Sequence, residues 1–266
     1  MARLRPQDSE RRRQRENAHD FSEALARGLA VLGAFGPDRR QATLSDLARA
    51  LDLPRSTVRR SLLTLAAQGL VETDGRLFRV TPKVMALAAA FLRSNPATPL
   101  LQPVCEAVCA ELETLCSASV LDREEAVLVA RAAPAQRQHI GIGVGFRMPA
   151  FCSAGGRVLL AALPDAALDA YLDRLQPQPQ TVFTLTDKTR LREVILAVRA
   201  EGHALVSEET ELGLRSIALP VPDGRGGVIA AIGIGLHAEK GSVDMLRGHC
   251  LDLLRRRLAG LPPRPA

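Results

Sequence analysis

One stretch constrains the fold more than any other: LDLPRSTVRRSLLTLAAQGLVETDGRLFRV, residues 51–80. Pro54 suits the first turn of a helix, where a missing N–H costs nothing. Apolar side chains then recur at helical spacing, and Gly69 supplies a C-terminal stop. Two short strand patterns follow, joined by Asp74-Gly75, a strong signal for a two-residue hairpin turn. The stretch therefore predicts a helix followed by a β-hairpin.

Two further helices are predicted before this stretch. Residues 21–35 carry leucines spaced for one helical face and end at a Gly-Pro pair. Residues 44–51 form a shorter helix that Thr43 can cap, with an acidic residue three positions on. Another helix pattern comes after the hairpin, in residues 82–96. Helix, helix-turn-helix, hairpin and linker helix make the order of a winged helix-turn-helix.

The third helix has the features of a DNA-recognition helix. With Val58, Leu62 and Leu65 facing inward, basic and hydroxyl side chains crowd its N-terminal half, the part that meets base edges in a major groove. Arginine can chelate guanine O6 and N7, while hydroxyl and backbone N–H groups bind phosphate. The predicted DNA contacts are Thr43, Arg55, Ser56, Thr57, Arg59, Arg60, and, on the hairpin, Arg76 and Arg79.

The distribution of charge supports this interpretation. Residues 1–96 carry 17 Lys+Arg and 10 Asp+Glu, a net +7, whereas residues 97–266 carry 18 and 19, a net −1. Such asymmetry indicates a polyanion-binding part joined to a neutral part. Aromatic residues make up only 3%, which argues against a stacking platform for single-stranded nucleic acid. The alternative is a solvated basic face on a protein-binding winged helix; fold pattern, charge and placement together favour double-stranded DNA.

After Pro96 the pattern becomes mixed. A long amphipathic helix comes first, and helices lie between and after the strands that follow. The strands are predicted at residues 117–122, 126–132, 138–145, 215–221 and 228–236. Hairpin-linked strands with such helices predict an α+β fold, with a largely antiparallel sheet covered by helices.

Alternating glycines on two of these strands suggest a ligand pocket. Gly141, Gly143 and Gly145 share one face of their strand, as do Gly233 and Gly235 of theirs. Faces without side chains leave a concavity or let another backbone approach. A pocket is favoured here over helix packing, because such cavities are the default binding sites.

An anion site is predicted at the start of one helix. The small residues Ser153, Ala154, Gly155 and Gly156 precede an apolar helical run, and free N–H groups at a helix N-terminus can receive a carboxylate. Arg147, in the loop before them, can pair bidentately with a carboxylate. A surface ion pair is the alternative role for that arginine.

Catalysis, metal binding and membrane insertion are not expected. The five cysteines are odd in number and form no CxxC pair, which indicates reduced thiols in a cytoplasmic protein. The segment Cys152-Ser153 invites comparison with a nucleophile, but no GxSxG surrounds it, and the sequence places none of the five histidines beside it. The longest apolar run, near residues 84–92, is too short to span a bilayer, and the N-terminus carries no export signal.

Several spaced motifs resemble the IclR family of bacterial transcriptional regulators. They are ARGLAVLGAF, LSDLARALDLPRSTVRRSLLTLAAQGLVE, SAGGRVLLA, VRAEGHALVSEE and GLRSIALPV, and the resemblance covers about residues 20–260. LPRSTVRRSLLTL together with FRMPAFCSAGGRVLLA is most similar to the branch that controls protocatechuate, β-ketoadipate and 4-hydroxybenzoate catabolism.

The resemblance implies a winged DNA-binding domain, a linker helix that helps to dimerise, and a GAF-like domain that binds a small organic effector. The expected organisation is a disordered basic tail at 1–19, a winged helix-turn-helix at 20–81, a linker helix at 82–96, an effector domain at 97–260 and a tail at 261–266. The arginine run in the first tail is either solvated or an arm on DNA. A homodimer or tetramer on operator DNA is expected, with RNA polymerase as a partner if the protein activates, and no cofactor.

The resemblance also places the effector. In the family the segment matching Ser153–Gly156 helps to bind it, and Ser216 stands where a cysteine is common. Gly233 and Gly235 stand where relatives that bind small oxo acids commonly have serine. Glycine removes two hydroxyls and adds room, so the effector is expected to be larger than a three-carbon acid, which fits an aromatic or ring-fission acid.

Overall fold

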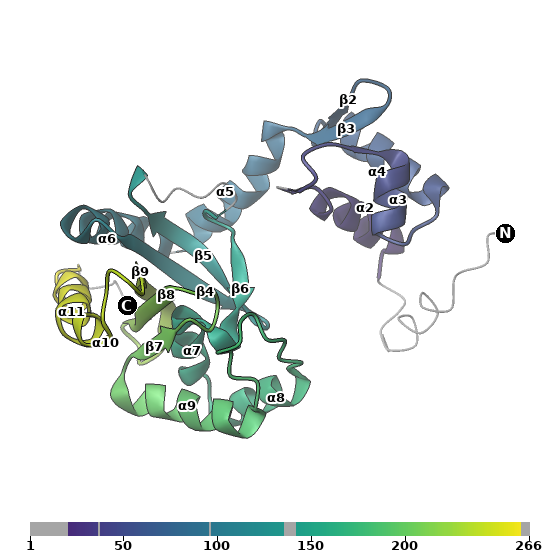
Figure 1. The fold of residues 1–266 in the computed structure, drawn as a ribbon. Helices are drawn as coiled ribbons and strands as arrows, with labels where there is room; N and C mark the ends of the chain where they lie inside the picture. The colour runs from purple at the N-terminus through teal and green to yellow at the C-terminus, as the bar shows by residue number, and fades with distance from the viewer. Residues whose placement is uncertain (1–20, 37, 96, 136–141, 262–266) are drawn as a thin grey trace. The chain divides into compact units, whose positions relative to one another are not determined.

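The computed structural model describes residues 21–36, 38–95, 97–135 and 142–261. The chain forms two compact units, Met1–Ala89 and Ala90–Ala266 (Figure 1). The division between them falls inside helix α5 (Met85–Ser94), which follows a short 3₁₀ turn at Pro82–Val84. The linker helix predicted from the sequence is therefore present.

The N-terminal unit is a winged helix-turn-helix. Its elements are α2 (Glu23–Gly33), β1 (Ala42–Thr43), α3 (Leu44–Ala50), α4 (Arg55–Ala67), β2 (Val71–Thr73) and β3 (Leu77–Val80). The strands form an antiparallel sheet in the order β1-β3-β2, and β1 is a strand that the sequence pattern did not predict. The predicted inward residues Val58, Leu62 and Leu65 are buried in its core, with Val31 of α2 and Leu47 of α3.

The hairpin turn closes around two residues, Gly75 and Arg76, one position later than the predicted Asp74-Gly75 turn. The strand pairing ends at Thr73 and Phe78, and one more backbone hydrogen bond joins the Asp74 N–H to the Leu77 carbonyl at 3.3 Å. The Asp74 carboxylate supports the turn, because it accepts hydrogen bonds from the N–H groups of Arg76 (2.9 Å) and Leu77 (2.8 Å). Gly75 adopts a φ of +98°, as expected for a glycine in such a turn.

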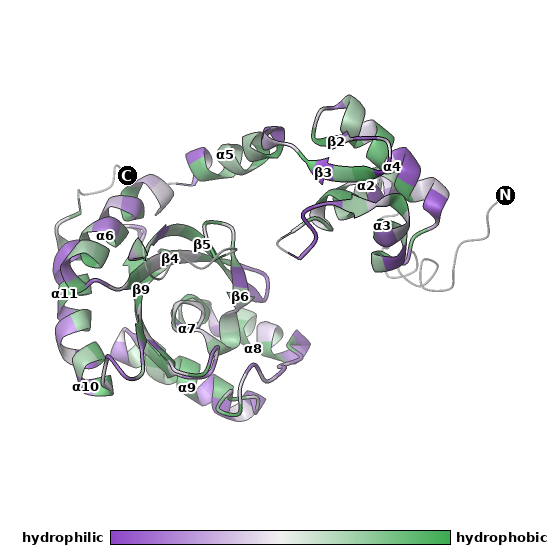
Figure 2. Ribbon diagram, turned by 45° about the horizontal axis from the view of Figure 1, so that its top comes forward, coloured by the Kyte–Doolittle hydropathy of each residue, from purple (hydrophilic) through white to green (hydrophobic). Residues whose placement is uncertain are grey.

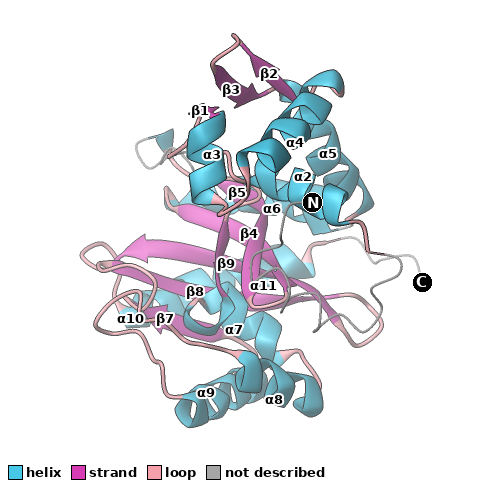
Figure 3. Cartoon of the chain, turned by 90° about the vertical axis from the view of Figure 1, so that its right-hand side faces the viewer, coloured by secondary structure: helices cyan, strands magenta, loops and turns pink. Residues whose placement is uncertain are grey.

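The C-terminal unit is built on a six-stranded sheet in the order β6-β5-β4-β9-β8-β7, with every pairing antiparallel. The strands are β4 (Leu115–Asp122), β5 (Glu125–Ala132), β6 (Arg147–Pro149), β7 (Ala204–Ser207), β8 (Leu214–Pro222) and β9 (Val228–His237). The helices are α6 (Ala97–Leu112), α7 (Ala154–Ala161), α8 (Asp165–Arg174), α9 (Lys188–Glu201), α10 (Val243–Met245) and α11 (Leu251–Ala259). The predicted α+β class is confirmed (Figure 3), whereas β6 and β7 had not been predicted.

The two faces of this sheet bury separate cores. On one face, α6 and α11 cover the aliphatic side chains of β8 and β9. On the other face, the sheet curls around α7, with α8 and α9 packed outside it (Figure 2). The apolar surface removed from water on both faces is the main force that holds the layers together. The helix α7 therefore lies inside the curve of the sheet.

One predicted strand is not formed where the structure describes it. Residues 142–145 make a turn, and residues 138–141, including Gly141, lie outside the described ranges. Gly145 has a φ of +89°, and the Phe146 N–H returns to the carbonyl of Gly143 at 3.0 Å. The alternation of glycines was misleading here, because glycine at this position serves a left-handed turn rather than a strand face.

Candidate functional site

The predicted recognition helix α4 follows a tight turn after α3. Asp52 in that turn has a φ of +49°, and the Leu53 N–H bonds to the carbonyl of Ala48 at 3.0 Å. Pro54 then stands at the N-cap position of α4, one residue before the first turn in which the sequence pattern placed it. The turn joins two short helices through backbone contacts, which is the arrangement of a helix-turn-helix.

Burial of one stripe of α4 leaves the opposite stripe in solvent. Arg55, Ser56, Arg59 and Arg60 are exposed, and Thr57 is half-buried. Among the residues that the structure describes, no ion pair is formed by Arg55, Arg59, Arg60 or by Arg76 of the hairpin turn. Unpaired guanidinium groups on the exposed face of α4 and in the hairpin turn are suited to phosphates and guanine edges.

Two predicted DNA contacts already have partners in the free protein. Arg79 Nε lies 2.6 Å from Glu72 Oε1, in a cross-strand pair between β3 and β2. Thr43 caps α3: its hydroxyl accepts from the Asp46 N–H and donates to the Asp46 carboxylate. To contact DNA, Arg79 and Thr43 would have to share or break these bonds. Within the described ranges, Arg55, Arg59, Arg60 and Arg76 have no such bonds to break.

The predicted anion site lies in the first turn of α7. Ser153 is the N-cap, and its hydroxyl accepts from the Gly156 N–H at 3.2 Å. Ser153, Ala154 and Gly156 are buried, whereas Gly155 is half-buried. A Cβ on Gly156 would lie 2.2 Å from the Ala150 carbonyl oxygen, so glycine is needed there for packing of the preceding turn.

The alternating glycines of β9 do not open a wide cavity. A Cβ on Gly233 would lie 3.1 Å from the Cβ of Ala218, and one on Gly235 would meet Leu115 at 3.3 Å. Neighbouring strands have thus taken up the space, which is the close-approach alternative for strand glycines. Ser216 pairs with Gly235 and shares its face of the sheet, half-buried. Space for a ligand on the α7 face of the sheet is therefore set by the distance between α7 and the small strand residues that face it.

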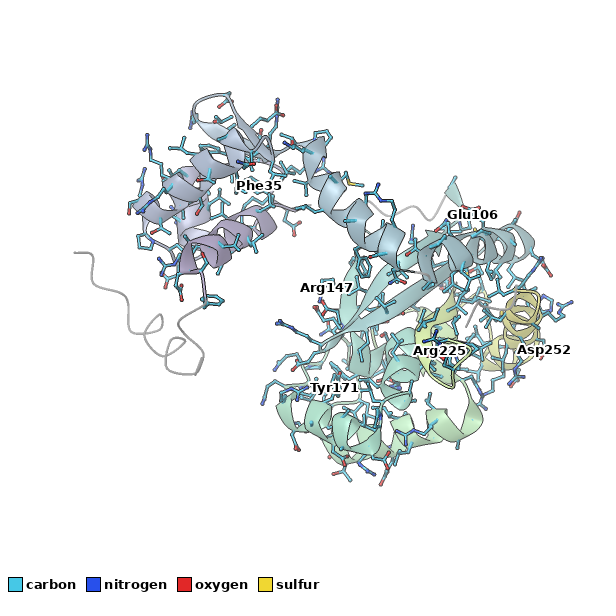
Figure 4. All side chains as sticks on the ribbon, turned by 180° about the vertical axis from the view of Figure 1, so that it is seen from behind. Phe35, Glu106, Arg147, Tyr171, Arg225 and Asp252 are labelled. Atoms are coloured by element: carbon cyan, nitrogen blue, oxygen red, sulfur yellow. The ribbon has the colours of Figure 1, made fainter. Side chains whose placement is uncertain are left out.

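Arg147 lies at the edge of the sheet, on β6 (Figure 4). Its guanidinium forms ion pairs of 2.6 Å with both Asp122 and Glu125. These two carboxylates raise the pKa of Arg147 and occupy two of its edges. The surface ion pair weighed as an alternative is what the structure shows, and an effector carboxylate would have to displace it.

Sequence patterns missed a buried ion pair behind the anion site. Arg157 of α7 is 3% exposed, and its terminal nitrogens meet both carboxylate oxygens of Glu209 at 2.7 Å. Arg157 Nε also donates to the carbonyl of Phe151 at 2.8 Å, and the Leu185 N–H donates to Glu209 at 2.9 Å. The acidic run Glu208, Glu209 and Glu211 has the sequence pattern of a solvated turn, but Glu209 is buried in this ion pair.

The sequence around Glu209 gives no local sign of its burial. Glu208 pairs with the nearby Arg215 at 3.9 Å, whereas the partner of Glu209 lies 52 residues away in the chain. An arginine inside the otherwise apolar helix α7 was the one available signal, because a buried charge needs a partner.

The structure gives Cys152 and Ser153 no catalytic geometry. Burial and the nearby Glu209 raise the pKa of Cys152 to about 12, so the thiol stays protonated at neutral pH. The Ser153 hydroxyl is engaged in the helix cap, and no described histidine hydrogen-bonds to either residue. Within the described ranges there is also no cluster of metal-ligating side chains and no helix long and apolar enough to cross a membrane.

The N-terminal unit is a winged helix-turn-helix with a basic recognition helix. The C-terminal unit places the N-terminus of α7 inside a curled sheet. A DNA-binding domain and a ligand-binding domain in one chain are the parts of a one-component transcriptional regulator. Two family models match: the IclR helix-turn-helix domain over residues 24–75, and the bacterial transcriptional regulator IclR C-terminal domain over residues 90–256. The chain belongs to the IclR family of bacterial transcriptional regulators.

Relatives point to one branch of this family. The Pca regulon regulatory protein of Pseudomonas putida is 37% identical over 236 residues, which are 88% of this chain and 81% of that protein. A transcriptional regulator from Rhodococcus sp. RHA1 is 40% identical with a TM-score of 0.79, covering 90% of this chain and 96% of that one. An IclR homologue from Microbacterium hydrocarbonoxydans, solved with 4-hydroxybenzoate, is 26% identical with a TM-score of 0.76, over 90% and 97% of the two chains.

Proposed function

We propose that this regulator binds an aromatic or ring-fission acid in its C-terminal domain and thereby controls transcription of aromatic-catabolism genes. The first turn of α7 carries the proposal, because it presents a helix N-terminus inside the curve of the sheet (Figure 2). The likeness to the Pca regulon regulator and to a homologue holding 4-hydroxybenzoate supports the same ligand class.

Recognition of the operator DNA is assigned to α4. Its unpaired arginines would read the major groove, while the wing and the start of α3 would fix the register on the phosphates. The protein would act in the cytoplasm, where it reaches its operator. Effector binding would change the spacing or order of two winged domains in a dimer, and operator affinity would change with it.

A dimer is supported by an unpartnered apolar surface on the winged unit. Leu25 and Leu29 of α2 are 62% and 56% exposed, and Leu87 of α5 is 57% exposed. The three side chains line one cavity of about 560 Å³, together with residues of α4. An exposed apolar patch of this kind marks an interaction surface, and the second copy of the chain is the proposed occupant of its α2 and α5 side, which leaves Thr57 and Arg60 on the α4 side for DNA.

A calorimetric titration tests the sensor. The purified protein is titrated with protocatechuate, 4-hydroxybenzoate, β-ketoadipate and pyruvate, and operator binding is measured with and without each acid. Saturable binding of an aromatic or ring-fission acid, together with a change in operator affinity, is expected. Binding of pyruvate alone would contradict the ligand class, and binding of none would leave the C-terminal domain with a purely oligomeric role.

A further inference from the structure

The C-terminus of the recognition helix is hydrogen-bonded to the beginning of the linker. Carbonyl groups at a helix C-terminus have no partner inside the helix, and α4 has its C-cap at Gln68. Lys83 Nζ donates to the carbonyl of Gln68 at 2.8 Å. Thr81 donates its hydroxyl to the carbonyl of Gly69 at 2.5 Å and its N–H to that of Leu70 at 3.0 Å. Three successive carbonyls at the end of α4 are thus bound by two residues of the linker.

The two side chains are built into this contact. A Cβ on Gly69 would lie 3.5 Å from Lys83 Cδ and 3.7 Å from Lys83 Nζ, so the lysine packs directly over the end of α4. Its ammonium stands at the negative end of the helix dipole, which favours a cation. The Thr81 hydroxyl also accepts from the Lys83 N–H at 3.2 Å and caps the 3₁₀ turn before α5. One hydroxyl therefore fixes both the end of α4 and the start of the linker.

Apolar packing does little to fix the direction of the linker. All of residues 82–94 are described, and none of them is buried by the single chain. Met85 and Leu87, at the start of α5, are 65% and 57% exposed. The hydrogen bonds of Thr81 and Lys83 are therefore an essential part of the attachment of the linker to α4.

The linker is also the covalent connection between the two units, because their division falls between Ala89 and Ala90 inside α5. Coupling between distant sites is carried by rigid elements and the hydrogen bonds that join them. We propose that Thr81 and Lys83 are positioning residues that make α4 and the start of α5 move as one body, so that a displacement of the linker on effector binding reorients the recognition helix. The inference rests on the proposed function and assigns the contact through which the effector acts on DNA binding.

The test measures the coupling factor, which is the ratio of the operator affinities with and without acid. Wild type and Thr81→Val/Lys83→Met are compared with and without saturating protocatechuate, 4-hydroxybenzoate and β-ketoadipate in turn. For the acid that acts on the wild type, a factor of about 5- to 150-fold is expected. In the double variant the factor should fall towards no change, because two of the three hydrogen bonds are removed. Calorimetric affinity of the acid for the free protein should stay that of the wild type, since the substitutions lie in the other unit.

Single and conservative variants separate this contact from general effects. Lys83→Met and Thr81→Val should each lower the coupling factor in part, whereas Lys83→Arg and Thr81→Ser keep the cation and the hydroxyl and should retain most of it. Arg93→Met is the matched control, because Arg93 is exposed in the last turn of α5 and its loss changes the net charge by the same amount. Retained operator binding and an unchanged melting temperature show that each variant is folded, and Lys83→Met replaces an exposed side chain.

The outcomes separate the two proposals. An unchanged coupling factor in the double variant, or an equal loss in Arg93→Met, overturns the role of Thr81 and Lys83 and leaves the proposed function intact. A loss of operator affinity that is the same with and without acid is one such outcome, and it would assign Lys83 to a phosphate contact or to the stability of α4. Failure of the wild-type operator affinity to respond to any of the acids overturns the proposed function, and this inference with it.

Discussion

At the residue scale, the exposure and ion pairing of an arginine decide whether it binds a partner or stabilises the fold. Arg59 on α4 is exposed and unpaired within the described part of the chain, whereas Arg157 on α7 is buried in a bidentate ion pair. An exposed, unpaired guanidinium is available to a partner macromolecule. A buried, fully paired one holds its own fold together.

Arg59→Ala is expected to relax operator discrimination if Arg59 reads a base. The loss of a bidentate contact to guanine costs about 1–3 kcal/mol at one operator position, and a phosphate contact would instead weaken all DNA about equally. Binding to a set of operator variants at several salt concentrations distinguishes the two. Arg192→Ala is the matched control, because Arg192 is an exposed arginine of the C-terminal domain, paired with Asp169 and not among the predicted DNA contacts. A uniform loss with a lower salt slope would assign Arg59 to phosphate.

Arg157→Met is expected to destabilise the C-terminal domain by about 3–5 kcal/mol, because it leaves the Glu209 carboxylate buried without its cation. Adding Glu209→Gln should recover part of that loss, since the amide oxygen still accepts from the Leu185 N–H. Urea denaturation measures both. Arg192→Ala, which breaks the exposed pair with Asp169, should change stability little. Equal losses in the free energy of unfolding for Arg157→Met and Arg192→Ala would show that the buried ion pair stabilises the domain no more than the exposed one.

At the element scale, α3 depends on its first turn. Thr43 and Asp46 form a reciprocal capping box, and the hydrogen bonds from Thr43 lower the pKa of Asp46 below its ordinary value of 3.8. A carboxyl whose pKa is lowered by folding adds stability above its unfolded pKa and loses it as the pH falls through the folded pKa. The contribution of this box is therefore complete at neutral pH and disappears only in acid.

Thr43→Ala is expected to raise the Asp46 pKa towards its ordinary value and to destabilise the winged unit by about 0.5–2 kcal/mol, the usual cost of an N-cap hydroxyl. Carboxyl titration by NMR follows the pKa, and thermal unfolding at pH 7 follows stability. Thr43→Ser keeps the hydroxyl and should restore both. An Asp46 pKa that does not move in Thr43→Ala would show that the cap is absent in solution.

At the scale of the whole molecule, the proposed dimer would present two copies of the winged unit to the operator. The double variant Leu25→Ser/Leu29→Ser should weaken the dimer, because it makes the exposed apolar face of α2 polar. Sedimentation equilibrium measures the oligomer, and footprinting should show half-sites about 10 or 20 base pairs apart for the wild type. Leu63→Ser is the control, since Leu63 on α4 is 49% exposed and does not line the α2 cavity. An unchanged oligomer would assign dimerisation to another surface.

Effector and operator must be coupled reciprocally. If the acid changes operator affinity by some factor, saturating operator must change the affinity for the acid by the same factor, which is about 5- to 150-fold for typical coupling energies. Calorimetric titration of the acid into protein alone and into the protein–operator complex measures the factor. Unequal factors would show that a further equilibrium, such as a change of oligomeric state, is coupled to binding of the acid or of the operator.

The sequence by itself determined the winged fold, the order of the helices and the place of the basic residues. These features depend on neighbours in the chain: the stripe of Val58, Leu62 and Leu65, the proline before it and the glycine after it all act within a few residues. The first turn of α7 was predicted for the same reason, because small residues before an apolar helical run form a local pattern.

Only the tertiary structure decided the surroundings of that turn. The pairing of Arg157 with Glu209 and the approach of Ser119 to Gly155 join residues far apart in the chain, and no local pattern encodes such contacts. The glycines of β9 show the same limit: the sequence predicts a face without side chains, whereas Ala218 and Leu115 take up its space. Side chains from distant strands compete for every gap in a close-packed interior, so the final shape of a binding site is settled by packing.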